Sequence, residues 1–247
     1  MWCQSRVPGH LRLFASFNFF TLYKTMDISR LKVFDWIMLA QGTGLTLVLC
    51  LGALVGGGVI ASLANIPTVW PQLHAARALV IGYVELFRST PLMLQLVAIF
   101  FALPLFGIKV APFLAAMIGL VLYSVAYLTE ILRSGLQAVP RGQWETALSL
   151  GMSRLQIVRY VIVAQAARIS IPSIVSFTVM LVKGSSVVSV IGFVELTRAG
   201  RLVVEWTREA FIVWLVVAAI YFVICYPLSL LAGRLEEKLG HGTRSAA

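Results

Sequence analysis

Long apolar segments alternate with short polar ones along this chain, a pattern that predicts an all-α integral membrane protein. An α-helix rises 1.5 Å per residue and the hydrocarbon core of a bilayer is about 30 Å thick, so about 20 apolar residues cross it. Five stretches come close to that length, and we expect five transmembrane helices. They cover residues 37–63, 89–108, 110–129, 169–194 and 210–233.

Prolines and single charges mark the ends of these stretches. Pro67 follows the first stretch and Pro104 lies near the end of the second, while Lys109 and Pro112 separate the second stretch from the third by a tight hairpin. Lys183 lies inside the fourth stretch, directly before Gly-Ser-Ser. Two forms of that stretch remain open: one continuous span, or a helix broken with the lysine at depth.

Residues 140–157 form a polar interruption that predicts two short helices in different directions. Pro140 suits the start of the first helix, and Gly151 offers a left-handed stop after it. Ser153 followed by Gln156 is a capping box, which starts a second helix at once. We therefore expect a bent helix pair that presents an apolar and acidic knob to water.

Composition supports the membrane assignment. The chain has 247 residues, of which 60% are hydrophobic and 12% charged, and a soluble domain of this size carries about twice that share of charge. The net charge of +10 comes from Lys and Arg in the short polar segments, where the positive-inside bias puts them. No basic groove or base-stacking platform is readable, so we exclude nucleic acid as a partner.

The basic residues also predict the orientation. Arg154, Arg159 and Arg168 lie in the segment after the third span, which places the loop 134–168 in the cytoplasm. Five spans then put the N-terminus outside and the C-terminus inside, with a short cytoplasmic tail at 235–247. The membrane domain is 36–234.

Five basic residues ahead of the first span lie outside in this orientation, but the cytoplasmic loops carry more. The N-terminal extension, residues 1–35, has two interpretations. It is an amphipathic lead-in at the membrane surface, or translation begins at Met26 and the preceding residues are a misassigned start.

The chain offers little for covalent chemistry or for a cofactor. Cys3, Cys50 and Cys225 are widely spaced, and no Cys/His pattern fits a metal site. No nucleophilic triad is suggested, and the phosphate-binding loop G-x-x-x-x-G-K-[ST] is absent from the sequence. We expect no metal, no cofactor and no enzyme activity, and no ATP hydrolysis by this chain itself.

The polar interruption resembles a known motif. Glu145-Thr-Ala147-x-x-x-Gly151 is similar to the EAA motif of the membrane subunits of bacterial ABC importers. Further segments, running from about 36 to 234, resemble the polar amino acid branch of those permeases, the histidine, glutamine, glutamate and arginine type. These are Tyr83-Val-Glu-Leu-Phe-Arg-Ser-Thr-Pro91, Tyr127-x-x-Glu130-x-x-Arg133-Ser-Gly135 and Val182-Lys183-x-Ser185-Ser186-Val187. Two departures, Thr146 for the first Ala and Ala164 where many members have Pro, put only the fine docking geometry in doubt.

The resemblance implies a MetI-like permease fold in the bacterial inner membrane and a set of partners. Those partners are two ATPase subunits that use ATP and Mg²⁺, a second permease subunit, identical or paralogous, and an external solute-binding protein. It also implies that the polar interruption is the coupling helix that meets the ATPase. The residues expected to carry this coupling are Arg141, Gly142, Gln143, Glu145, Thr146, Ala147 and Gly151.

Four polar residues are candidates for the translocation path: Lys183, Ser185, Ser186 and Glu130. An unpaired ammonium inside a membrane is costly and usually lines a cavity, although Lys183 can also snorkel to the outer interface from a short helix. Glu130 with Arg133 is spaced as an interfacial ion pair, which is the commoner role for such a pair. Arg88 is expected to anchor the second helix at the headgroups.

The function predicted from these features is import of a polar amino acid, or a related small polar solute, by alternating access. The alternative is a stand-alone secondary transporter, which needs intramembrane carboxylates for ion coupling. The apolar cores of the five stretches contain no Asp or Glu, which argues against it. A membrane enzyme acting on lipid would need a cluster of His, Asp, Glu or Ser at the interface, and none is evident.

Overall fold

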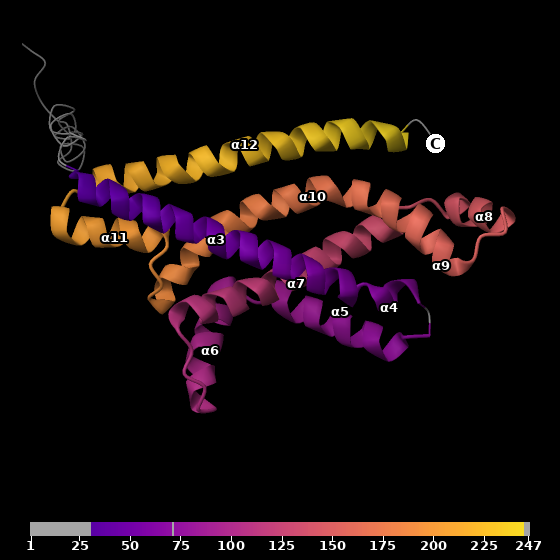
Figure 1. The fold of residues 1–247 in the computed structure, drawn as a ribbon, viewed down its shortest axis with the longest axis horizontal. Helices are drawn as coiled ribbons and strands as arrows, with labels where there is room; N and C mark the ends of the chain where they lie inside the picture. The colour runs from indigo at the N-terminus through magenta and orange to yellow at the C-terminus, as the bar shows by residue number, and fades with distance from the viewer. Residues whose placement is uncertain (1–30, 71, 245–247) are drawn as a thin grey trace, which may run out of the picture.

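A computed structural model describes residues 31–244 except residue 71, and within these residues the chain is helical without strands. Four long helices lie along one axis, with α5 beside α7 and α6 at a steep angle to the rest (Figure 1). The segments at 1–30, with most of the predicted N-terminal extension, and at 245–247 lie outside the described residues. In chain order the main helices are α3 Val33–Ala64, α5 His74–Ser89, α6 Leu92–Leu105, α7 Pro112–Gln137, α8 Arg141–Ser149, α10 Val163–Gly184, α11 Leu196–Thr207 and α12 Ala210–Arg244.

Shorter elements join these helices. They are α4 Ile66–Val69, α9 Arg154–Gln156, the π-helical turn η2 Ile157–Ile162 and the 3₁₀ segment η3 Ser185–Ile191. Four helical segments are long and apolar enough to cross a membrane: Val33–Ala64, Pro112–Gln137, Arg154–Ile191 and Ala210–Leu239. The count rises to five when α5 and α6 are taken as one broken span. The prediction of an all-α membrane protein is therefore confirmed.

The predicted second span was wrong in its shape and limits. Instead of one helix over 89–108, α5 and α6 meet at 106°. Pro91 disfavours helical backbone at the preceding residue, and Thr90 is extended, so α5 ends there. The Gln95 side-chain amide then donates to the carbonyl oxygens of Phe87 at 2.7 Å and Thr90 at 3.0 Å, which satisfies groups that the end of α5 leaves unpaired.

The first, third and fifth spans lie at the predicted positions, and the third and fifth end later than expected. α7 continues to Gln137 instead of ending near residue 129, and α12 continues through Arg244, past the expected limit at residue 233. The fourth stretch, expected over 169–194, is helical through Ile191, and its helix type changes after Gly184 from α to 3₁₀. Of the two predicted forms, the continuous span agrees with the structure, and only the helix geometry changes beside Lys183.

The centre of the bundle is the contact between α3 and α7. Gly57 on α3 lies so close to α7 that an added Cβ would come within 2.5 Å of the Ser124 Cβ atom. Small residues let membrane helices approach in this way and gain dispersion energy. α7 is buried along most of its length, packed by α3, α5, α6 and α10, so it forms the core on which the other helices assemble.

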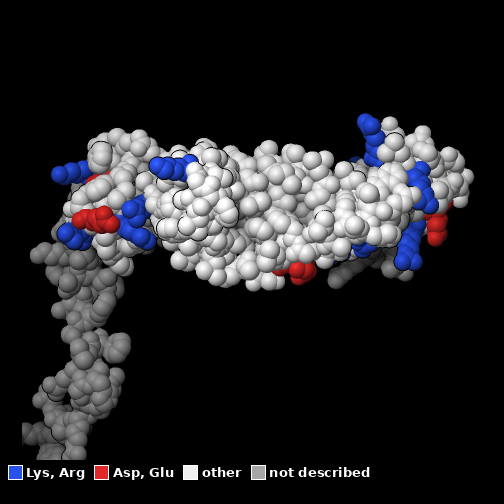
Figure 2. Space-filling model, turned by 90° about the horizontal axis from the view of Figure 1, so that it is seen from below, with Lys and Arg blue, Asp and Glu red and all other residues white. Residues whose placement is uncertain are grey.

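Most charged side chains seen from this side collect toward the two ends of the bundle, and the band between them is mostly uncharged, with an acidic patch at its lower edge (Figure 2). α8 and the C-terminal end of α12 lie at one end, and α11 with the beginning of α3 lies at the other (Figure 1). The two ends of the described chain are therefore on opposite sides of the mostly uncharged band, as an odd number of crossings requires. Which end faces the cytoplasm stays a prediction.

Candidate functional site

The polar interruption folds as a compact knob at one end of the bundle. α8 ends in a Schellman motif: the Gly151 N–H donates to the Leu148 carbonyl at 2.9 Å, and the Met152 N–H donates to that of Ala147 at 3.2 Å. Gly151 has φ 75°, the left-handed conformation expected from the sequence. The capping box also forms, since Ser153 accepts from the Gln156 N–H and returns its own N–H to the Gln156 side chain.

The knob has its own small core, separate from that of the bundle. Ala147 is its buried centre on α8, and Trp144 and Met152 pack around it. Ile157 and Ile162 of η2 are fully buried against the same cluster, which joins α8 to the start of the α10 span. A side-chain hydrogen bond of 2.9 Å from Gln165 to Gln143 adds a second link between the two elements. α8 is therefore joined to the α10 span by packed side chains and a hydrogen bond.

The outer face of the knob is uncovered. Of the predicted coupling residues only Ala147 is buried, and the other six are exposed: Arg141, Gly142, Gln143, Glu145, Thr146 and Gly151. Leu148, Leu150 and Leu155 expose 54%, 76% and 63% of their surfaces beside them. An apolar surface next to a carboxylate, on a stiff base, is the geometry of a contact site for another protein.

Lys183 lies on an exposed part of α10, one residue before the helix type changes. Within the described part of the chain it forms no ion pair closer than 4 Å. The two serines that follow have satisfied hydroxyls: Ser185 bonds to the Val182 carbonyl and Ser186 to that of Lys183, each at 2.8 Å. Of Lys183, Ser185 and Ser186, only Lys183 therefore has a side-chain polar atom without a bonded partner in the described part of the chain.

Glu130 lies elsewhere in the molecule. α7 and α10 run in opposite directions, and the rings of Tyr127 and Phe177 stack between them at 5.5 Å. From that contact Glu130 lies one turn toward the α8 end and Lys183 lies nearly two turns toward the other end. The four predicted path residues therefore form two separate groups.

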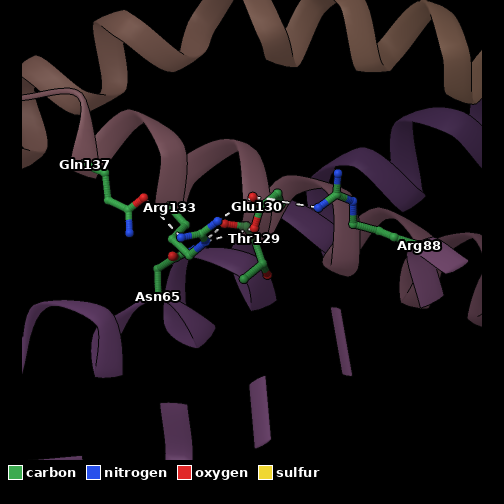
Figure 3. A network of polar contacts seen from close by, with 6 residues as sticks. All are labelled: Asn65, Arg88, Thr129, Glu130, Arg133 and Gln137. Carbon is green, nitrogen blue, oxygen red and sulfur yellow. Dashed lines mark hydrogen bonds and ion pairs between the residues drawn. The ribbon is translucent and has the colours of Figure 1, made fainter. Parts of the chain in front are cut away.

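The Glu130 carboxylate, in the second half of α7, belongs to an ion-pair network (Figure 3). Arg133 donates to both of its oxygens, at 2.6 and 2.9 Å, and also bonds Gln137 at 3.1 Å. Arg88 approaches from α5 to 3.7 Å and lies over the Tyr127 ring. The expected ion pair between Glu130 and Arg133 forms, and Arg88 is engaged by Glu130 and Tyr127. That this pair and Arg88 lie at the membrane interface stays a prediction.

The sequence did not reveal Glu195, which is fully buried where α11 begins. Its carboxylate accepts from the N–H groups of Thr197 and Arg198 at 2.8 Å and from the Tyr221 hydroxyl at 3.2 Å. Burial raises the pKa of this carboxyl above its usual range, against the lowering effect of the two backbone donors. Glutamate is an uncommon N-cap, so its position before an amphipathic helix was a weak signal.

Comparison with known proteins identifies relatives along most of the chain. A family model described as "Binding-protein-dependent transport system inner membrane component" matches residues 57–241. The glutamine transport system permease protein of Escherichia coli (strain K12) is 33% identical over 218 residues, which cover 83% of this chain and 98% of that protein. The L-cystine transport system permease protein of Bacillus subtilis (strain 168) is 33% identical over 205 residues, 83% of this chain and 87% of that protein.

Solved structures agree with the sequence relatives. The crystal structure of an amino acid ABC transporter with histidines has a TM-score of 0.76 and 34% identity, covering 81% of this chain and 94% of that one. An inward-facing structure of the MetNI methionine ABC transporter has a TM-score of 0.65 at 18% identity, covering 83% and 99% of the two chains, which shows a shared fold.

Proposed function

This chain belongs to the binding-protein-dependent transport system inner membrane components, the permease family of ABC importers, and we propose that it is the membrane subunit through which a polar amino acid is imported. The observation that carries the proposal is a 34% identical solved amino acid transporter that aligns with 81% of this chain. Permeases named for glutamine and for L-cystine are similarly related, which supports a polar amino acid or a close derivative as the solute.

The knob around α8 is the proposed contact for an ATPase subunit. Its exposed leucines offer an apolar surface, Glu145 adds one negative charge, and the small core holds the shape rigid. A helix seated in a groove of the partner transmits movement because neither element bends easily. The link through Ile157 and Ile162 then directs that movement into the α10 span.

The remaining partners follow from the family. We propose a second permease subunit beside this one, two ATPase subunits that bind ATP and Mg²⁺, and an external solute-binding protein. In this arrangement the α8 end faces the cytoplasm and the beginning of α3 lies outside. Exposed apolar side chains on α6, such as Phe101 at 63% and Leu105 at 84%, are surfaces that lipid or the second permease subunit covers.

Lys183 is the residue we propose for the translocation path. A free ammonium on a membrane-spanning helix costs several kcal/mol unless it meets water or a counter-charge, and the carboxylate of an amino acid is such a counter-charge. The helix changes to 3₁₀ geometry after Gly184, and in this proposal Ser186 lies beside Lys183 in the wall of the path. Ser185 is fully buried, with its hydroxyl bonded to the Val182 carbonyl. Glu130, held by two arginines, serves as a structural ion pair in this proposal.

The proposal is tested on the assembled complex. The chain is purified from its native membrane, the co-purifying subunits are identified, and the complex is reconstituted in liposomes with its solute-binding protein. ATP hydrolysis and uptake are then measured across a panel of polar amino acids. Stimulation of both by one amino acid or a small group supports the assignment. Uptake that needs an ion gradient, without an ATPase in the complex, would show a secondary transporter instead.

A further inference from the structure

α11 carries a row of charged side chains at the end of the bundle away from α8 (Figure 1). One face of this helix is buried, with Leu196, Ala199, Gly200 and Val203. The opposite face carries residues at the spacing i, i+3, i+7 and i+10, the last of them in the turn that ends the helix: Arg198, Arg201, Glu205 and Arg208. Three arginines and one glutamate give this face, the arginine ridge, an excess of positive charge.

The positive charge of the ridge is not compensated within the described part of the chain. None of its arginines forms an ion pair within 4 Å there, not even Arg201 with Glu205 one turn away. Glu209, the residue after the ridge, takes part in an interaction of its own. Arg198 is partly buried, and its Nε atom is shielded from water without a hydrogen-bond partner among the described residues. A donor in that condition is costly, so the ridge calls for acceptor groups from another molecule.

The backbone of Arg208 gives a second, independent indication. Its φ is 60°, in the left-handed region, and it is the only residue other than glycine with a positive φ in the described part of the chain. Glycine takes this conformation at a helix end without steric cost, whereas a long side chain is disfavoured there. Residues held in such conformations are typical of functional sites. The position therefore indicates a use for the guanidinium that outweighs the fit of the backbone.

The ridge also has a rigid base. An added Cβ at Gly42 of α3 would come within 2.8 Å of the Ala199 Cβ atom, and one at Gly200 within 2.7 Å of a methyl carbon of Val217 on α12. α11 is thus packed tightly between the first and the last span. A surface that is already ordered loses little conformational freedom when another molecule binds, which suits the ridge for docking a protein.

We propose that the arginine ridge docks an acidic surface of the external solute-binding protein. The inference rests on the proposed function, in which the α8 end meets the ATPase and the α11 end lies outside. The matching family model is itself named for binding-protein-dependent transport, so a protein partner belongs at the outer end. Arg201 and Arg208 each offer a planar set of donors that fits a carboxylate. A second copy of this chain is a poor occupant, because a two-fold contact through this face would bring the same arginines together.

Binding to the whole complex in nanodiscs of phosphatidylcholine tests the proposal. The probe is the solute-binding protein that stimulates ATP hydrolysis by the complex, and its association and dissociation rates are measured. Arg201→Glu should weaken binding roughly five-fold or more, mainly through slower association, because surface charges guide the encounter. Glu205→Gln should strengthen binding, since it removes the carboxylate from the ridge. Arg234→Gln is the matched control: an exposed arginine toward the C-terminal end of α12, far from α11.

Arg208→Gly separates docking from folding. Glycine relieves the left-handed conformation, so the melting temperature should be unchanged or higher, while binding should weaken by about two- to five-fold because one charged contact is lost. A charge exchange adds a direct test of contact. Replacing one acidic surface residue of the binding protein by lysine should restore its binding to Arg201→Glu.

Three results would overturn the ridge as a docking surface. If the unaltered complex binds the probe and both Arg201→Glu and Arg208→Gly bind it equally well, the ridge fails and the proposed function stands. If no solute-binding protein stimulates the unaltered complex, the proposed function fails and the ridge with it. If the arginine variants lose binding only in nanodiscs that contain anionic lipid, the arginines act on lipid headgroups instead of on the binding protein.

Discussion

Trp206 and Asp35, separated by 171 positions in the sequence, are joined by a hydrogen bond of 2.8 Å from the indole N–H to a carboxylate oxygen. Asp35 is 3% exposed, and its second oxygen accepts the Lys32 backbone N–H at 2.8 Å. Both oxygens of a buried carboxylate are thus satisfied, one by the start of α3 and one by the last turn of α11. This contact ties the beginning of the membrane domain to the element that precedes its last span.

Trp206→Phe removes the indole donor while keeping an aromatic ring. It leaves one oxygen of a buried carboxylate without a partner, which costs about 1–3 kcal/mol, so the melting temperature in detergent should fall by several degrees. Trp214→Phe is the control, because the Trp214 ring is 39% exposed and has no corresponding bond in the described chain. Equal melting temperatures for the two variants would show that the bond contributes nothing.

Substitution by alanine should affect stability differently at Gly57 and Gly58, two consecutive glycines of α3. An added Cβ at Gly57 would meet the Ser124 Cβ atom at 2.5 Å, whereas at Gly58 the nearest atom lies at 3.9 Å. Gly57→Ala should therefore lower stability by about 1–3 kcal/mol through overpacking, and Gly58→Ala should be neutral or raise it by up to about 1 kcal/mol. Thermal unfolding of both variants measures the difference. Equal effects would mean that α3 and α7 do not approach closely at Gly57.

Features of this fold that depend on neighbouring residues were predictable from the sequence. The left-handed stop at Gly151 and the capping box of Ser153 and Gln156 are set by local backbone chemistry, and the structure has them where they were expected. The long apolar stretches likewise predicted spans, since only a helix satisfies its own backbone in lipid. The ion pair of Glu130 and Arg133 followed from their spacing on one helix.

Features set by distant contacts were not predictable. The sequence marked a helix boundary before Pro91, but the angle between α5 and α6 depends on packing against α7, and Gln95 stabilises the bend through atoms of α5. Glu195 was taken as part of a polar segment because its burial depends on Tyr221, 26 positions away. Which polar groups of Thr129 and Asn65 remain without partners is also a property of the assembled bundle alone.

Glu195 should make stability depend on pH in a defined direction. Burial raises the pKa of its carboxyl, and the residue lies between η3 and α11, outside the spanning segments. The folded state then binds this proton more tightly than the unfolded state does. The contribution of the protonated carboxyl to stability is therefore fully present below the ordinary pKa near 4.5, and it is lost as the pH rises through the pKa of the folded state.

In Glu195→Gln the side chain cannot ionise, so the decrease of stability with rising pH should disappear. Melting temperatures of both proteins between pH 5 and 8 provide the measurement. Parallel curves for the two proteins would show that Glu195 does not titrate in this range.

The positive charge of Lys183 should be needed for amino acid uptake. Lys183→Met keeps most of the side-chain volume and removes the ammonium, so amino acid uptake in liposomes should fall at least ten-fold, while Lys183→Arg should keep a substantial part of it. Lys109→Met is the matched control, because Lys109 is an exposed lysine in the turn between α6 and α7. If Lys183→Met transports as well as the unaltered protein, the residue only reaches the membrane surface.

Gly151→Asp should uncouple ATP hydrolysis from transport while the protein still folds. A Cβ at this position meets nothing within 4 Å, and aspartate tolerates a φ of 75° better than most residues, so the cost to folding is small. The new carboxylate lies beside exposed leucines at the C-terminal end of α8, where a negative charge is unfavourable and a partner surface has to desolvate it. Substrate-stimulated ATP hydrolysis in the assembled complex should therefore fall at least ten-fold, with an unchanged amount of protein in the membrane.

Gly107→Asp is a close control, since Gly107 has φ 78° and equally open surroundings in the turn after α6, far from α8. Equal loss in both variants would point to a general effect of charge on assembly, and normal stimulation in Gly151→Asp would remove α8 from the coupling path.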